Sequence, residues 1–404
     1  MTTKRTFELG GLEYLRTHSR APGLGYAVAV ADQLGRVLFG RTHPSPPPRL
    51  EGRTLVIAKI DHLGDLLMIT PLLVQLRAQA PTTRLVLLIG GWSVPLAQLL
   101  QELGLCDGHV VRSPWALHLG ATVGRRILED IRTAREAAGQ LAGLAPAALV
   151  DLRPFTPNSL LLAHQLKVPY RVGFALRGLS YTLHASLRYD EDQPLGQLFL
   201  NALPALGLRP ANYDGPTLGP FAPRVAEVPS PAGMPSQPIV VVQAASRTAA
   251  KNAPLAAWKA LLPVLARTHV LVFVGSRSDA KVIAPLLAMV PPDCRCDLTG
   301  RTTVAQLFKV CGAGEMVLSV DSLAAHIGQA MNRPTLVLTD TARTPSSCYP
   351  HGRPGLHLVS KDAPPVTLLA ALAPLLGPAR CAGTRLRTDR CASFPSKALD
   401  PAGE

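Results

Sequence analysis

Residues 55–65 read LVIAKIDHLGD. The first four are a short apolar run bounded by turn residues, which is typical of a buried strand in a parallel sheet. A helical pattern follows over residues 65–79, and a second apolar run extends from Arg84 to Ile89. Strand, helix and strand at this spacing predict a βαβ unit. We therefore expect an α/β fold, in which ligands bind beyond the carboxyl ends of the strands.

The same alternation recurs along the chain, with one interruption. Prolines are frequent from Leu208 to Pro238, a composition that indicates a linker rather than a core element. The pattern predicts strands at 148–152, 170–174, 239–242, 269–274, 316–320 and 335–338, and helices at 254–265 and 280–289. We therefore predict an N-terminal extension (1–50), a first α/β domain (51–208), a linker (209–238), a second α/β domain (239–378) and a tail (379–404).

Composition narrows the class of partner. The chain has 404 residues, of which 47% are hydrophobic, enough for a substantial core. Its net charge of +14 favours an anionic partner, while an aromatic content of 5% argues against a base-stacking nucleic-acid surface. The seven cysteines are odd in number and scattered, unlike a secreted disulfide scaffold, so we expect a cytoplasmic protein. We find no apolar run as long as the roughly 18–20 residues that a membrane span needs.

The basic N-terminal extension allows two interpretations. Its apolar residues Phe7, Leu12 and Leu15 can share one face of a helix, and basic residues flank them (Lys4, Arg5, Arg16 and Arg20). Such a helix can pack on the first domain, or it can lie on a membrane surface as a peripheral attachment. The acidic residues Glu8 and Glu13 favour the packed helix.

Three loops follow predicted strands and carry polar residues. The first contains Gly64-Asp65, the second Ser246 and Lys251, and the third Asp321-Ser322-Leu323 with His326. The first loop lacks both the dinucleotide-binding glycine pattern and the P-loop. Taken singly, each loop has a structural explanation, either a capped helix N-terminus or a solvated lysine.

Taken together, the loops resemble glycosyltransferase family 9, the heptosyltransferase family. The resemblance extends from about residue 53 to about residue 354, with its motifs in order. It rests on Leu55-Val56-Ile57 with Gly64-Asp65 and Thr70-Pro71; Arg171-Val172-Gly173-Phe174; Lys251-Asn252-Ala253-Pro254 with Trp258; Asp297 to Thr303 with Gln306-Leu307; and Asp321-Ser322 with His326, Ala330 and Pro334-Thr335.

This resemblance implies the GT-B fold, with two Rossmann-like domains facing each other across a cleft. It also implies inverting sugar transfer without an obligatory metal or other cofactor. Asp65 would be the catalytic base. The donor nucleotide sugar would contact the second domain at Ser246, Lys251, Asp321, Ser322, Leu323 and His326. The acceptor would lie against the first domain, where the sequence offers Lys59, His62, Arg153 and Arg171.

The expected reaction is transfer of a sugar, heptose from ADP-heptose, to an anionic glycolipid such as a lipopolysaccharide-core intermediate. The enzyme would then work in the cytoplasm, in peripheral contact with the inner membrane. Departures from the family pattern keep two alternatives open: another nucleotide sugar, or a non-catalytic nucleotide-sugar-binding protein. Leu323 stands where the family has a glycine that lets the backbone approach a phosphate, and Ala253 stands where it has a tryptophan. Asp190-Glu191-Asp192 resembles a metal-binding D-x-D motif, but acidic residues before a helix at 195–203 have a simpler explanation.

Overall fold

The protein is described here from a computed structural model of the chain. The described residues are 30, 32–35, 37, 38, 45–112, 123–154, 166–176, 180–190, 192–340, 348–350 and 352–376. Within this part of the chain, no helix is both long enough and apolar enough to cross a membrane. The tail predicted over 379–404 and the apolar residues of the predicted N-terminal helix, Phe7, Leu12 and Leu15, lie outside the described residues.

The first half forms a six-stranded parallel sheet in the order β3-β2-β1-β4-β5-β6. Its strands are β1 (Thr54–Lys59), β2 (Arg84–Ile89), β3 (Gly108–Val111), β4 (Ala148–Asp151), β5 (Tyr170–Phe174) and β6 (Ala185–Leu187). The helices are α3 (Leu63–Leu67), α4 (Thr70–Gln79), α5 (Val94–Glu102), α6 (Val123–Ala142), α8 (Leu195–Leu200) and α9 (Ala202–Ala205). Strands β1, β2 and β4 are almost entirely buried, as their apolar runs predict.

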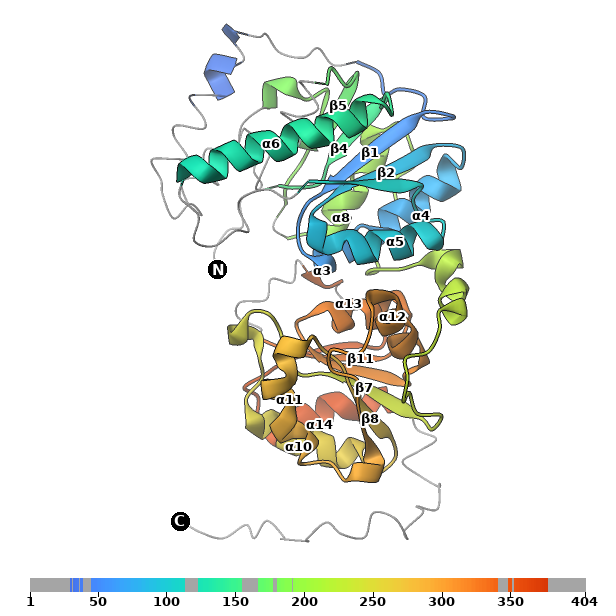
Figure 1. Cartoon of the computed structure of the whole chain (residues 1–404), viewed down its shortest axis with the longest axis vertical. Coiled ribbons are helices and arrows are strands. Elements are labelled where there is room, and N and C mark those ends of the chain that lie inside the picture. Colours follow the sequence, from blue (N-terminus) through green and yellow to red (C-terminus); the bar gives the residue numbers. More distant parts are fainter. Residues whose placement is uncertain are drawn as a thin grey trace.

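The second half repeats this arrangement in a sheet of order β12-β11-β10-β7-β8-β9 (Figure 1). Its strands are β7 (Ile239–Gln243), β8 (Val270–Phe273), β9 (Arg295–Asp297), β10 (Met316–Val320), β11 (Thr335–Thr339) and β12 (Leu356–Ser360). The helices are α10 (Leu255–Leu265), α11 (Ala280–Leu287), α12 (Val304–Ala313), α13 (Leu323–Ala330) and α14 (Pro365–Leu372). Numbered within each half, both sheets have the order 3-2-1-4-5-6, which is the doubly wound order of dinucleotide-binding folds. The predicted α/β class is therefore confirmed.

The helix predicted over residues 65–79 is in fact two helices. It breaks at Met68 and Ile69, between α3 and α4. Pro71 stands in the first turn of α4, where a residue without an N–H is tolerated. The Thr70 hydroxyl donates to the carbonyl of Leu67 at 2.8 Å and joins the two helices. Because α3 is short and separate from α4, the direction of its first turn, which contains Asp65, does not depend on the direction of α4.

The proline-rich stretch contributes more to packing than its composition suggests. It contains the 3-10 helix η4 (Gly219–Glu227), which packs against α12. Leu218 and Val225 are fully buried in the main core. The Arg224 guanidinium donates to the carbonyl of Leu103 at 2.9 Å, and the Lys309 ammonium donates to the carbonyl of Ala226. The stretch therefore binds to both halves as well as connecting them.

Candidate functional site

The predicted site residues other than Arg171 gather at two equivalent places in the two sheets. In the first sheet, strand order reverses between β1 and β4, where Lys59 and Arg153 lie at or just beyond the strand ends. In the second sheet it reverses between β7 and β10, which end at Gln243 and Val320, next to Asp321. Ligands bind at such switch points in doubly wound folds. The helices that follow, α3 and α13, contact each other across the interface (Figure 1).

Two buried cations share one carboxylate at the first switch point. The Lys59 ammonium lies 2.7 Å from Asp61 Oδ2 and 4.5 Å from the centre of the Phe199 ring. Arg153 Nε lies 3.4 Å from Asp61 Oδ1. Burial alone would raise the pKa of Asp61, but the two cations hold it below its usual value. Arg153 Nη1 is buried and has no hydrogen-bond partner among the described residues.

Asp65 lies in the first turn of α3, in a reciprocal cap with His62. Its carboxylate Oδ2 accepts the backbone N–H of His62 at 3.1 Å, and the His62 side chain faces the N–H of Asp65. The capping role that the sequence allows is therefore present in the structure. It occupies one of about four acceptor positions of the carboxylate, so Asp65 can still accept a proton.

At the second switch point, Asp321 holds the lysine of the predicted donor loop. Lys251 Nζ lies 2.7 Å from Asp321 Oδ2, and the Tyr349 hydroxyl donates to Asp321 Oδ1 at 2.7 Å. Burial would raise the pKa of Asp321, but these two hydrogen bonds and the lysine charge lower it. The Lys251 side chain is 46% exposed and has two further N–H donors. The structure thus brings together two predicted donor-site residues that are 70 positions apart in the sequence.

The loop that carries Lys251 is braced on both sides. The Asn252 side chain accepts the backbone N–H of Ser246 at 2.9 Å and closes the loop. The ammonium of Lys361, which follows β12, donates to the carbonyls of Ala250 and Asn252. Ser246 therefore contributes its backbone to the shape of the loop, and Lys251 leaves a fixed backbone.

The N-terminus of α13 is partly capped from within the sheet. Ser322 occupies the N-cap position, but its side chain makes no capping hydrogen bond. Instead, Gln243 Oε1 accepts the backbone N–H of Ala324 at 2.7 Å. Gln243 does not bond to the backbone N–H groups of Ser322 and Leu323. These two groups lie at the positive end of the helix dipole.

His326 connects the two switch points. It is almost fully buried, and its ring stacks on that of Tyr349 with a centroid distance of 5.0 Å and an interplanar angle of 9°. A Cβ atom added to Gly64 would lie 3.2 Å from His326 Cδ2, so the Gly64-Asp65 turn packs directly against the histidine. Asp65 is also among the charges that act on the His326 ring.

The structure does not bring Arg171 to these residues. Arg171 is the second residue of β5, at the end of the sheet opposite the strand termini that carry Lys59 and Arg153. Its guanidinium donates to the carbonyls of Thr182 and Val168 at 2.6 Å each. In this motif, Arg171 therefore holds a loop against β5. The structure does not place Arg171 with the other residues expected on the acceptor side, so that expectation was wrong.

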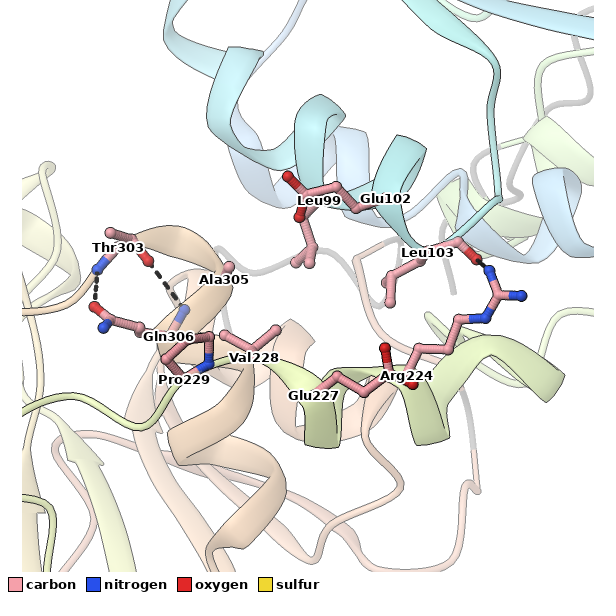
Figure 2. Close-up of a pocket in the computed structure, with 10 residues that line it drawn as sticks. All are labelled: Leu99, Glu102, Leu103, Arg224, Glu227, Val228, Pro229, Thr303, Ala305 and Gln306. Carbon is pink, nitrogen blue, oxygen red and sulfur yellow. Dashed lines mark hydrogen bonds between the residues drawn. The ribbon is translucent and has the colours of Figure 1, made fainter.

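A hollow of about 320 Å³ lies on another part of the interface, between α5, η4 and α12 (Figure 2). Apolar Leu99, Leu103 and Val228 line it together with Glu102 and Glu227. None of its ten lining residues is a predicted site residue. Thr303 and Gln306 at its rim form the capping box of α12, so the family-like stretch before that helix has a structural role here.

Within the described residues, no group of three or more His, Cys, Asp or Glu side chains could hold a metal ion. In the D-x-D-like segment, the Asp190 carboxylate accepts the backbone N–H of Asp192 at 2.9 Å, as an aspartate in a tight turn does. Asp190 and Asp192 precede α8, which is shorter than the helix expected over 195–203 and is followed by α9.

Comparison with known proteins tests the resemblance. Residues 161–350 match the family model of glycosyltransferase family 9 (heptosyltransferase). This match covers just under half of the chain. None of the curated proteins compared with the chain matches it in sequence. The family predicted from the five motifs is therefore confirmed by the match to the family model.

Solved structures agree with the fold of this chain. A family 9 glycosyl transferase from Veillonella parvula is 16% identical with a TM-score of 0.66, covering 82% of this chain and 99% of that chain. The E. coli ADP-heptose lps heptosyltransferase II is 17% identical with a TM-score of 0.61, covering 80% and 98%. E. coli heptosyltransferase WaaC, solved with ADP-2-deoxy-2-fluoro heptose, is 15% identical with a TM-score of 0.61, covering 80% and 98%. The expected GT-B fold is confirmed.

Three residues at the site were not predicted from the sequence. Asp61 pairs with both cations, Gln243 caps α13, and Tyr349 supports Asp321. Gln243 follows a predicted buried strand directly, so its position at a strand end was a usable signal. Tyr349 carries no such signal, because it comes from a loop far from every motif.

Proposed function

We propose that this glycosyltransferase transfers heptose from ADP-heptose to an anionic glycolipid of the lipopolysaccharide-core type, with inversion at the anomeric carbon. The observation that carries the proposal is the arrangement at the two switch points. Asp65 on the first half follows Gly64, which contacts His326 of α13 on the second half. The N-terminus of α13 adjoins the ion pair between Lys251 and Asp321. The heptosyltransferases among its structural neighbours, one solved with an ADP-heptose analogue, support the choice of donor.

The second half has the chemistry to hold a nucleotide diphosphate. Lys251 can keep its ion pair with Asp321 and give its remaining N–H donors to phosphate oxygens. The backbone N–H groups of Ser322 and Leu323 face the same region at the positive end of α13. Leu323 keeps the N–H that a glycine would supply, although its side chain adds bulk. The negative charge that develops on the departing diphosphate is thereby stabilised.

The first half supplies the base and the acceptor side. The acceptor hydroxyl attacks the anomeric carbon, the bond from that carbon to the phosphate oxygen breaks, and Asp65 takes the hydroxyl proton. Lys59 and Arg153 would attract the anionic groups of the acceptor, since the two cations share the single carboxylate of Asp61 and leave a net positive charge. His62 is exposed beside the same turn and completes the acceptor side.

The test is turnover with defined donors. We expect ADP release from ADP-heptose to depend on a lipopolysaccharide-core acceptor, and the product to have the inverted anomeric configuration by NMR. UDP-sugars and GDP-sugars serve as control donors. Release of another nucleotide diphosphate would assign a different sugar. Tight ADP-heptose binding without acceptor-dependent release would instead support the non-catalytic binding protein that Leu323 leaves open.

A further inference from the structure

Gly64 is a glycine for reasons of space rather than backbone conformation. It is the second residue of α3 and is not among the residues with positive φ. Glycine within a helix is less favourable than alanine by about 0.5–1 kcal/mol, so the position would gain from a side chain if there were room. A Cβ atom there would lie 3.2 Å from His326 Cδ2 and 3.6 Å from His326 Nε2. The edge of the histidine ring thus fills the place of the missing side chain.

The histidine cannot easily move away from Gly64. Its ring is 6% exposed and stacks face to face on Tyr349, which is 1% exposed. The Tyr349 hydroxyl is in turn fixed by its 2.7 Å hydrogen bond to Asp321, the carboxylate that holds Lys251. An unbroken series of contacts therefore runs from Lys251 of the donor loop to the turn that carries Asp65.

The Nδ1 nitrogen of the histidine has no part in this series. His326 Nδ1 is buried and has no hydrogen-bond partner among the described residues. Burial lowers the pKa of His326, and the positive charge of Lys251 lowers it further. The negative charges of Asp321 and Asp65 act in the opposite direction but do not outweigh burial. The ring is therefore neutral near pH 7, and what it offers Gly64 is a flat, uncharged surface.

We propose that His326 is a positioning residue, which sets the place of Asp65 by packing against Gly64 across the interface between the two halves. The proposal rests on the proposed function, in which Asp65 is the base. It assigns His326 a different role from the donor contact expected from the family motif. A donor contact would act on nucleotide affinity, whereas a positioning residue acts on the catalytic rate.

The first experiment separates these roles. We expect His326→Ala to lower kcat by about ten- to a hundredfold, since small misplacements of reacting groups have effects of this size. ADP affinity by calorimetry should stay within about twofold, which also shows that the variant is folded. His326→Phe keeps a flat ring against Gly64 and should retain most of the lost rate. A weaker ADP affinity with kcat unchanged, or a Phe variant as slow as the Ala variant, would overturn the proposal.

The second experiment is a double-mutant cycle between Gly64→Ala and His326→Ala. Alone, Gly64→Ala should lower kcat by about tenfold or more, because the new methyl group pushes on a fixed ring. Combined with His326→Ala, which makes space, it should cause little further loss, so the two effects are not additive. Gly139→Ala on α6 is the matched control, because a Cβ atom there meets nothing within 4 Å and kcat should not change. Equal loss from Gly64→Ala in both backgrounds would refute the contact.

Sugar transfer by the wild type separates failure of the proposed function from failure of this proposal, and unfolding of the same proteins in urea separates a positioning role from a merely structural one. If the wild type transfers no sugar, the proposed function fails, and the positioning role, which is defined by its effect on kcat, fails with it. If it transfers sugar but the cycle shows no coupling in kcat, the positioning role fails while the proposed function stands. Coupling in the free energy of unfolding alone, without coupling in kcat, would make the contact merely structural and would also overturn the proposal.

Discussion

Asp61 and Asp65 lie in the same turn but have different electrostatic surroundings. Asp61 is tied to Lys59 and Arg153, and its pKa is held low, so it is a poor proton acceptor. Asp65 accepts a backbone N–H and makes no ion pair among the described residues. Of the two carboxylates, Asp65 is therefore the one whose lone pairs can serve an acceptor hydroxyl. These contacts thus distinguish Asp65, which can act as a base, from Asp61, which balances charge.

Replacing Asp65 tests its role as the base. Asp65→Asn should lower kcat by about 10²–10⁴-fold, because the amide cannot take a proton. Its oxygen can still accept the N–H of His62, so the cap of α3 should persist and the melting temperature should change little. Steady-state kinetics and thermal unfolding measure the two effects. Activity within a few-fold of wild type would show that Asp65 only caps the helix.

Replacing Lys251 tests the diphosphate site. Lys251→Ala should weaken ADP binding by about 1.5–3 kcal/mol, the range for hydrogen bonds to charged groups. That corresponds to about a ten- to hundredfold rise in Kd by calorimetry. Lys259→Ala, an exposed lysine on α10, is the matched control and should leave ADP affinity as it is. An unchanged Kd for Lys251→Ala would remove this residue from the donor site.

At the scale of the elements, interior strands were predictable and edge strands were not. The strands β2, β5 and β10 match their predicted ranges, because strands buried on both faces are continuous apolar runs. The edge strands β6 and β9 have three residues each and are only partly buried, so their sequences show no such run. The loops at the strand ends were also predictable, because each begins where a continuous apolar run ends. The partner that each loop contacts across the interface was not predictable.

The pairing of β5 with β6 makes the fold sensitive to acid. His184 Nδ1 accepts the backbone N–H of Arg171 at 3.1 Å, which requires an unprotonated nitrogen. Burial, with the Arg171 charge nearby, lowers the pKa of His184 to about 4. The unfolded chain, with a histidine pKa of about 6.5, binds the proton more readily between these values. This contribution to stability is therefore complete above about pH 6.5 and is lost as the pH falls toward 4.

Thermal unfolding between pH 7.5 and pH 5 measures this effect. We expect the melting temperature of the wild type to fall with decreasing pH more steeply than that of His184→Asn. The asparagine oxygen can replace Nδ1 as acceptor but does not titrate. His357→Asn, on β12, is the control for replacing a histidine elsewhere. If His184→Asn had the same pH dependence as the wild type, the acid sensitivity would come from other groups.

At the scale of the whole molecule, the N-terminal extension bears on attachment to a membrane. Residues 32–35 are helical, and Gly35 is buried against the ring of Tyr181, so this part packs on the first half. The basic residues Lys4, Arg5, Arg16 and Arg20 all precede it. Deleting residues 1–29 therefore removes these charges and leaves the packed segment in place.

This deletion should reduce co-sedimentation with anionic vesicles while ADP affinity stays the same. Each basic residue near an anionic surface contributes about 1 kcal/mol, an effect that salt screens. Replacing the four basic residues with glutamine should have the same effect, and vesicles of neutral lipid are the control. A lower melting temperature with unchanged sedimentation would support the packed helix instead, and salt-independent binding would also count against electrostatic attachment.

The main apolar core does not stop at the boundary between the two sheets. It includes Leu99 and Leu103 of the first half, Val225 of η4, and Leu307 and Phe308 of α12. Two units that share one core lose their packing together, so calorimetry should record a single cooperative heat absorption rather than two. Ligand binding raises the stability of everything that unfolds in the same step. A nucleotide held by the second half would therefore slow amide hydrogen exchange in β1 and β2 of the first half.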